Sequence, residues 1–444
     1  MQSMMPSPSI IRSFNSFKQI YAATSTEKPP QTIDLESSLP QESKTNTSLF
    51  DHIFSIKGDK IRNLEWIDPY LEYIQQELEL HQIELLDPVL SRLTGSNNVD
   101  DKDRVEFVGA VATALKATRS KNRTVENIIV QVCELYEVTD ERVSEKEIGQ
   151  AIFLMLGWLS MLFKPQVDLK ALNSLQVLAS SDFPRQPFPL VKRPITSVLK
   201  KLGVILPDST KQGNEIETSE LYVSNLNYSS LSSIGGVRIK WVDTLDQHLD
   251  FDPRTRTLRL FRFPSLCALS YVNGIDNCFD RMISEYYQQA DLAEEYKREV
   301  LRSYRVIFGQ TGRARKLFNT DERKNAQGAL STCDPLLVEL CGRSIPKFPL
   351  CKLQVDLNQF RPEPMHYSKA EFFLFREKLD AIQRHISQQR PTRIQDMWRD
   401  HRDPLQWYTV WAVLAIAVIS MCLSLVQAIV GICQLYFSIH CNQP

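Results

Sequence analysis

The sequence predicts a mainly α-helical protein with a small β-hairpin unit and a single C-terminal transmembrane helix. Three observations lead to this fold class. Apolar residues recur at helical spacing through most of 50–164 and again over 275–308. Two strand-like segments flank a turn sequence between these helical parts. From Trp407 to Ile439 the chain contains no charged residue, and this run is long enough to cross a bilayer.

Length and composition bound what the chain can do. Its 444 residues are enough for two or three folded units, and the net charge of -1 gives no electrostatic case for nucleic acid as the main partner. The nine cysteines are scattered, without a C-x-x-C pair or zinc-ligand spacing. We therefore expect a reducing compartment, no metal and no cofactor.

Residues 1–48 are rich in Ser, Thr and Pro and have no long apolar face, so we expect a disordered tail. Residues 6–23 lack acidic side chains and contain Arg12 and Lys18, which leaves a mitochondrial transit peptide as an alternative. Two basic residues are few for such a signal, and we favour the plain tail.

Residues 49–181 are expected to form a helical domain. Ser144 and Glu147 match a capping box ahead of the uncharged stretch 148–163. This stretch is either a second membrane span or a fully buried core helix. We favour the core helix, because the run is shorter than a span and ends at once in Lys164 and Pro165.

Four prolines within 182–194 predict a domain boundary, followed by a mixed α/β unit over 190–310. A short helix is expected over 196–202, ended by Gly203. Alternation over 237–242 predicts a strand, and 248–252 with 257–263 predict a β-hairpin. Trp241, Phe251 and Leu260 should face a core, and Arg254 and Arg256 should lie at the exposed tip. A short helix followed by such strands has the outline of a winged helix.

The apolar stripe over 275–308 predicts one long helix, which Gly309 should end. The proline-rich stretch 311–365 is expected to be an irregular linker. Residues 366–403 should hold one further helix and a polar stem. Ser368 and Glu371 would cap that helix, which runs from Phe372 to about residue 389.

Residues 405–439 are expected to be the transmembrane anchor, with aromatic residues near both ends. Five arginines precede it within 384–402 and no basic residue except His440 follows it. The positive-inside bias therefore places the N-terminal part in the cytosol, with the endoplasmic reticulum or another endomembrane favoured. The sequons at Asn46, Asn122 and Asn227 would then stay unmodified.

One basic set is a candidate contact for anionic lipid or for a protein partner: Arg298, Arg302, Arg305, Arg313 and Arg315. The alternative, which we favour, is a solvated helix face.

Three further patterns carry little weight as functional sites. Residues 221–226 match the shorter strand motif of RNA-recognition domains, but no partner motif follows, so we expect a buried strand. Residues 309–316 lack the ending of a phosphate loop, so we expect a helix end and a solvated loop. His248 lies between Asp246 and Asp250, which would tune an imidazole, and we expect an exposed strand histidine. No catalytic motif is present, so we expect no enzyme, although a site assembled only in the fold stays an alternative.

Two stretches resemble a set of filamentous-fungal proteins of unknown function. Residues 235–265 contain a WVD…HL.FD…LRLFRFPS block, and residues 398–413 contain a WRDHRDP stem that leads into the anchor. The resemblance covers roughly residues 190–440 and implies an architecture, not an activity. Some of the similar proteins belong to accessory gene clusters that affect colony or hyphal surface traits.

These observations favour a tail-anchored, cytosol-facing interaction or scaffold protein, a fungal accessory factor in view of the resemblance. The first alternative is a membrane-tethered regulator with a winged-helix-like binding unit. The second is a factor that affects fungal colony or hyphal surface traits, and the third is an enzyme.

Overall fold

The computed structural model describes residues 49–54, 65–117, 123–137, 144–166, 174–177, 186–187, 192–204, 206–207, 220–269, 277–345, 366–367, 372–389 and 404–441. The predicted tail over 1–48 and the polar stem before the anchor lie outside these residues. Among the described residues, helices dominate and the strands are short. The mainly helical class is therefore confirmed.

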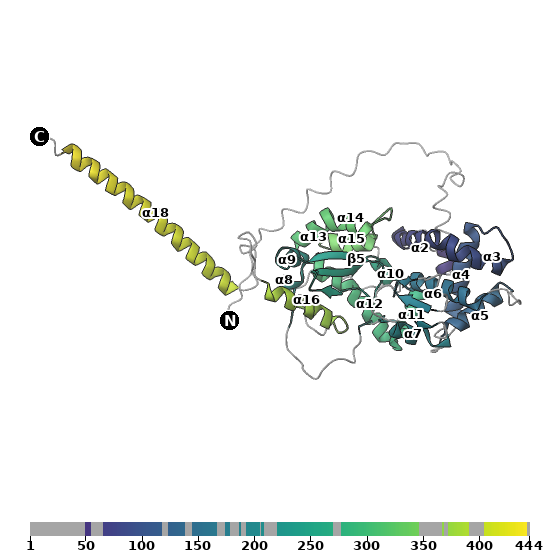
Figure 1. Cartoon of the computed structure of the whole chain (residues 1–444). Coiled ribbons are helices and arrows are strands. Elements are labelled where there is room, and N and C mark those ends of the chain that lie inside the picture. The colour runs from purple at the N-terminus through teal and green to yellow at the C-terminus, as the bar shows by residue number, and fades with distance from the viewer. Residues whose placement is uncertain are drawn as a thin grey trace, which may run out of the picture. The chain divides into compact units, whose positions relative to one another are not determined.

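Among the described residues, the N-terminal part begins with the helical residues 49–54 and the 3-10 helix η3 (Glu65–Ile67). Five longer α-helices and a π-helical turn follow. They are α2 (Asp68–His81), the turn η4 (Gln82–Leu86), α3 (Asp87–Thr94), α4 (Asp101–Ala117), α5 (Val125–Leu135) and α6 (Glu145–Ser160). Helix α6 packs against α2, α3, α4 and α5 (Figure 1). Every residue from Ile148 to Ser160 is buried, so the stretch 148–163 is a core helix, as favoured from the sequence.

The capping box predicted before α6 does not form. Ser144 is the N-cap residue, but its side chain makes no capping hydrogen bond. The carboxylate of Glu147 instead forms an ion pair with Arg92. The Glu147 side chain therefore pairs with Arg92 of α3 and does not bond the backbone at Ser144, as a capping box requires.

Three short strands and one helix follow: β1 (Pro165–Gln166), β2 (Ser174–Val177), β3 (Gln186–Pro187) and α7 (Ile195–Lys201). Helix α7 ends before Gly203, whose φ of 83° lies in the left-handed region, as the sequence predicted. The expected buried strand over 221–226 is wrong in length. Only β4 (Leu221–Tyr222) is extended and pairs with β8 (His366–Tyr367), and α8 (Val223–Leu226) takes the rest.

The predicted hairpin is confirmed by β6 (Phe251–Asp252) and β7 (Thr257–Phe261), which pair antiparallel. Strand β5 (Arg238–Val242) pairs in parallel with β7, so β7 is the central strand of this sheet. Leu260 is buried, Trp241 and Phe251 are half-buried, and Arg254 and Arg256 are exposed at the tip. The strand arrangement does not establish a winged helix.

The long helix predicted over 275–308 is two helices. The first, α11 (Cys278–Tyr287), begins with an Asn277 side chain that accepts a hydrogen bond from the Asp280 amide at 2.7 Å. It ends at Gln288, whose φ of 57° breaks the helix before α12 (Ala290–Tyr304) begins. A π-helical segment, η7 (Arg305–Gly309), continues α12 to the predicted end.

Residues 312–327 and 335–342 are helical, so the expectation of an irregular linker is wrong for most of its first half. The elements are α13 (Gly312–Leu317), η8 (Phe318–Glu322), α14 (Arg323–Gln327) and α15 (Pro335–Gly342). Pro335 occupies the first turn of α15, where a missing N–H is harmless, and Asp334 caps that helix. Pro335, which was expected to interrupt regular structure, thus lies at the start of a helix.

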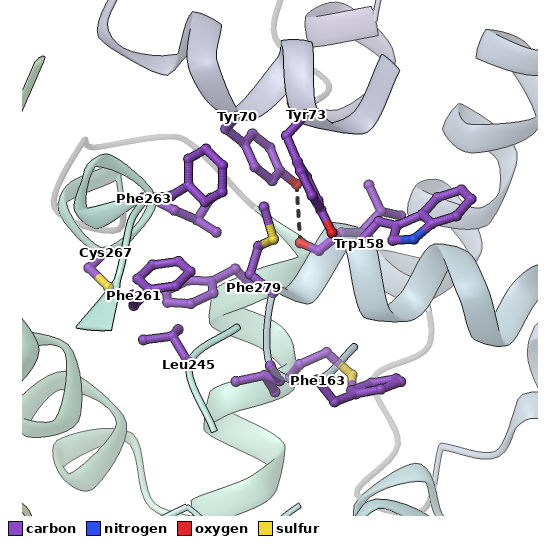
Figure 2. Packing of buried hydrophobic residues seen from close by; sticks show 14 of the residues in the cluster. Tyr70, Tyr73, Trp158, Phe163, Leu245, Phe261, Phe263, Cys267 and Phe279 are labelled. Atoms are coloured by element: carbon purple, nitrogen blue, oxygen red, sulfur yellow. Dashed lines mark hydrogen bonds between the residues drawn. The ribbon is translucent and has the colours of Figure 1, made fainter. Parts of the chain in front are cut away.

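The remaining elements are α9 (Tyr228–Ser233), α10 (Pro264–Leu269), α16 (Arg376–Gln388) and α18 (Pro404–Cys441). One cluster of buried residues runs from Leu49 to Ile386 and includes side chains from both sides of the boundary predicted near residue 190. Figure 2 shows these buried side chains: Tyr73 of α2 packs against Phe263, and Phe263 packs against Phe261. The Tyr70 hydroxyl donates to the Leu159 carbonyl at 3.2 Å.

Candidate functional site

A cluster of buried polar side chains joins α12 to the N-terminal end of α16. We call it the junction cluster and define it as Asp246, His248, Glu299, Ser303 and Lys378. Glu299 and Ser303 are one turn apart on α12, Asp246 and His248 lie on the segment before β6, and Lys378 belongs to α16. Four of its members are buried, with side chains 0–7% exposed, and Lys378 is half-buried. Buried polar groups at this density need a physical explanation.

Glu299 holds the start of the α16 segment. Its carboxylate accepts hydrogen bonds from the Leu374 amide at 2.9 Å and from the Phe375 amide at 2.8 Å. Both amides belong to the turn that leads into α16 (Arg376–Gln388), so this side chain from α12 ties that turn to the core. Burial raises the pKa of Glu299 to about 7, and the hydrogen bonds from these amides oppose that rise.

The imidazole of His248 is fully buried and both nitrogens are used, so the expectation of an exposed histidine is wrong. The Phe261 amide donates to Nδ1 at 3.2 Å, and Nε2 lies 2.9 Å from the Ser303 hydroxyl oxygen. Because an amide only donates, Nδ1 must accept, and the neutral ring then donates from Nε2. The Ser303 hydroxyl in turn donates to the Val300 carbonyl at 2.7 Å.

This arrangement excludes His248 as the base that activates Ser303. A general base must accept the serine proton, whereas here Nε2 carries its own proton and the hydroxyl donates elsewhere. Burial, assisted by the nearby charge of Lys378, holds the pKa of His248 well below its ordinary value, so the ring stays neutral. The pair is therefore a packing and hydrogen-bonding device.

Lys378 closes the cluster from α16. Its ammonium group donates to the His248 carbonyl at 2.8 Å and pairs with the Asp250 carboxylate at 2.7 Å. Asp246 is buried next to it, and burial raises its pKa to about 6, although the Thr244 hydroxyl donates to its carboxylate. The flanking acids predicted to tune His248 thus bind Lys378 and Thr244 instead.

The five arginines predicted as a lipid or partner contact do not form one surface. Arg305 is buried, and its guanidinium donates to the Leu340, Arg343 and Ser344 carbonyls at 2.7–2.9 Å. These carbonyls lie at the C-terminal end of α15, where a cation complements the helix dipole. Arg305 was expected on the surface, and that prediction is wrong.

The other four arginines are more accessible. Arg298 pairs with Glu294 and Glu295, and Arg315 donates to the Gly309 carbonyl at 2.7 Å. Arg302 is half-buried and Arg313 is exposed. The segment 309–316, expected to be a solvated loop, instead contains helix α13. A lipid or partner contact at these four residues stays a prediction.

No sequence pattern predicted a role for Glu299, Ser303 or Lys378. Their contacts join residues 55 to 130 positions apart, so no local motif shows them. One signal was present: Glu299 and Ser303 border the apolar stripe of α12, next to Tyr296 and Val300. Within the described residues, no group of His, Cys, Asp and Glu side chains fits a metal ion.

Helix α18 is the second candidate element. Its segment Trp411–Ser438 has 28 residues and is long and apolar enough to cross a membrane. Its described side chains are exposed, except that of Trp411, which is half-buried. Comparison with protein-family models, with curated proteins and with solved structures found no match for this chain.

Proposed function

We propose that this chain is a single-pass membrane protein whose folded part lies in the cytosol and binds other proteins without catalysing a reaction. Helix α18 carries this proposal. At 1.5 Å per residue its apolar segment is about 40 Å long, enough to cross about 30 Å of hydrocarbon with some tilt. The folded part has its own core, which ends at Ile386 before α18 begins.

The junction cluster supports an anchoring role for α16. This helix ends at Gln388, and α18 begins at Pro404, so α16 is the last described helix before the proposed anchor. A buried hydrogen bond to Glu299 fastens the turn before α16, and a half-buried one from Lys378 fastens its first turn, to the rest of the core. A force or displacement that enters through the anchor would reach the folded part at this point.

Exposed apolar side chains support protein binding. Leu80 is 73% exposed and Ile83 is 74% exposed, and they lie three residues apart where α2 passes into the π-helical turn. Residues at this spacing share one helix face, and π-helical turns are frequent at functional sites. In view of the resemblance to fungal proteins, the proposed process is an accessory one that affects colony or hyphal surface traits.

Membrane fractionation tests the anchor. We expect the full chain to remain in the membrane fraction after carbonate extraction, and a chain ending at Asp403 to be soluble. Leu425→Arg, near the middle of the span, should weaken insertion by about 3 kcal/mol, whereas Leu425→Ala should not. A soluble full chain would overturn the proposal.

Glycosylation tests the orientation. Asn227 is a poor acceptor in the fold, because it is 4% exposed and its side chain donates to the Val223 and Ser224 carbonyls. The useful native sites are therefore Asn46 and Asn122. We expect no mobility shift on endoglycosidase treatment, and modification of a sequon added on a long spacer after Pro444. Glycan at Asn46 would place the folded part in the lumen.

The alternative is a tethered regulator whose hairpin contacts nucleic acid or a partner. The exposed tip with Arg254 and Arg256 favours it. Binding of a DNA duplex to the chain that ends at Asp403, weakened by added salt and by Arg254→Ala, would support this alternative over the first.

A further inference from the structure

The polar side chains of α18 lie on one face of the helix. At about 100° per residue, six positions fall within about 40° on either side of Ser420. They are all the aliphatic hydroxyl and amide residues between 409 and 438: Thr409, Ser420, Ser424, Gln427, Gln434 and Ser438. Gly431 lies on the same face, whereas Trp411 and Tyr436 lie on the opposite one. We call this strip the polar face of α18.

Two amides on this face have no hydrogen-bond partner among the residues that the structure describes. Within the described residues, the Gln427 and Gln434 side chains are exposed and make no hydrogen bond, whereas the Ser424 hydroxyl donates to the Ser420 carbonyl at 2.9 Å. Gln427 lies about 4 Å along the axis from the middle of Trp411–Ser438. An amide at that depth has no water to bond, so it is strongly disfavoured unless another polar group meets it.

Gly431 gives an independent indication on the same face. A Cβ added there would meet no atom within 4 Å. No contact within the described part of the chain therefore requires a glycine at this position. In membranes, small residues on one face allow a second helix to approach closely, and polar side chains on it then bond across the contact.

From the two unmet amides and the open glycine we propose that α18 binds α18 of a second copy of this chain through the polar face, as a parallel pair. An amide is both donor and acceptor, so a glutamine can bond the same glutamine of its partner. Copies inserted in one direction place identical residues at one depth, and a two-fold axis then sets Gln427 against Gln427. This inference rests on the proposed function, because α18 must be in the bilayer.

Cysteine cross-linking in membranes tests the pairing, because the native thiols Cys422 and Cys433 point away from the polar face. The full chain is made with Cys133, Cys351 and the three cysteines of α18 replaced by serine, which leaves the four buried cysteines of the core. One thiol is then returned, either on the polar face by Ser420→Cys or Ser424→Cys, or on the opposite face by keeping Cys422. Disulfides need close Cα atoms, so only facing positions react efficiently under mild oxidation.

We expect the polar-face thiols to give a disulfide dimer and Cys422 to give little. Gln427→Leu should weaken the pair about 5- to 30-fold, on the scale of interhelical hydrogen bonds. Gly431→Ile should weaken it too, although a Cβ at this position meets no atom of the described residues within 4 Å. Leu425→Ala, on the opposite face, should leave cross-linking unchanged.

The outcomes separate the two proposals. Cross-linking of Cys422 as efficiently as the polar-face thiols would overturn the pairing, because the contact would have no preferred face. A chain that resists carbonate but does not cross-link from the polar face would also overturn it. That result would leave the anchor intact and point to the helix of another protein as the occupant. Release by carbonate would overturn the anchor itself.

Discussion

Glu299→Gln should flatten the dependence of folding stability on pH. The carboxyl of Glu299 is fully buried, and burial raises its pKa from the ordinary 4.5 to about 7. The folded state therefore holds this proton more tightly than the unfolded chain does. The stabilisation is complete below about pH 4.5 and is lost as the pH rises through about 7.

The size of the effect follows from that difference in pKa. At 1.36 kcal/mol per unit, the loss reaches about 3 kcal/mol at alkaline pH, and about 2 kcal/mol of it falls between about pH 5.5 and pH 8. His248 acts in the opposite sense, because its depressed pKa makes stability fall as the pH drops below about 6.5. The informative quantity is therefore the difference between the parent and the variant at each pH.

The measurement is urea unfolding of the chain that ends at Asp403, followed by tryptophan fluorescence. That chain keeps the whole buried cluster, which ends at Ile386. From about pH 5.5 to pH 8 we expect the unfolding free energy of Glu299→Gln to gain about 2 kcal/mol relative to the parent. Glu294→Gln, at an exposed position on the same helix, is the control and should follow the parent. A parent–variant difference that stays constant to within about 0.5 kcal/mol would refute the raised pKa.

Two further predictions concern stability. Gln150 is buried in α6 and neither atom of its amide has a hydrogen-bond partner, so Gln150→Met should raise the unfolding free energy by about 1–3 kcal/mol, and a loss in urea unfolding would contradict this. Trp241 stacks on Phe308 and donates to Glu322 at 3.0 Å. Trp241→Ala should therefore lower the melting temperature by the equivalent of about 3 kcal/mol, against about 0.5 for the exposed Arg254→Ala, and equal melting points would count against the packed sheet.

The helices and the hairpin that depend on neighbouring residues were predicted correctly from local sequence patterns. The uncharged stretch 148–163 was correctly assigned to a core helix because its length and its end at Pro165 are read directly from the sequence. The hairpin was found because strand alternation and a turn occur within a dozen residues. The break at Gln288 was missed, because glutamine carries no signal for a left-handed residue and the apolar stripe continues across it.

The junction cluster was missed for a different reason. His248 looked exposed because two acids flank it, yet the acids turn toward Thr244 and Lys378 while the ring enters the core. The flanking residues of a strand or turn point in different directions, so adjacency in sequence does not mean contact. The true partner, Ser303, is 55 residues away, and only the packing of α12 brings it near.

In helix α18 the placement of polar residues carries information that the length of the span does not. Counting charges identifies a candidate anchor but treats all sides of the helix alike. If anchoring were its only role, leucine would serve better than glutamine at 427 and 434, because leucine favours insertion and an unmet amide opposes it. Random placement would also scatter the polar side chains around the helix, whereas here they share one face. The unpaired amides disfavour insertion, and a second helix that bonds to them removes this penalty. Because the amides lie on one face, the partner must pack against that face.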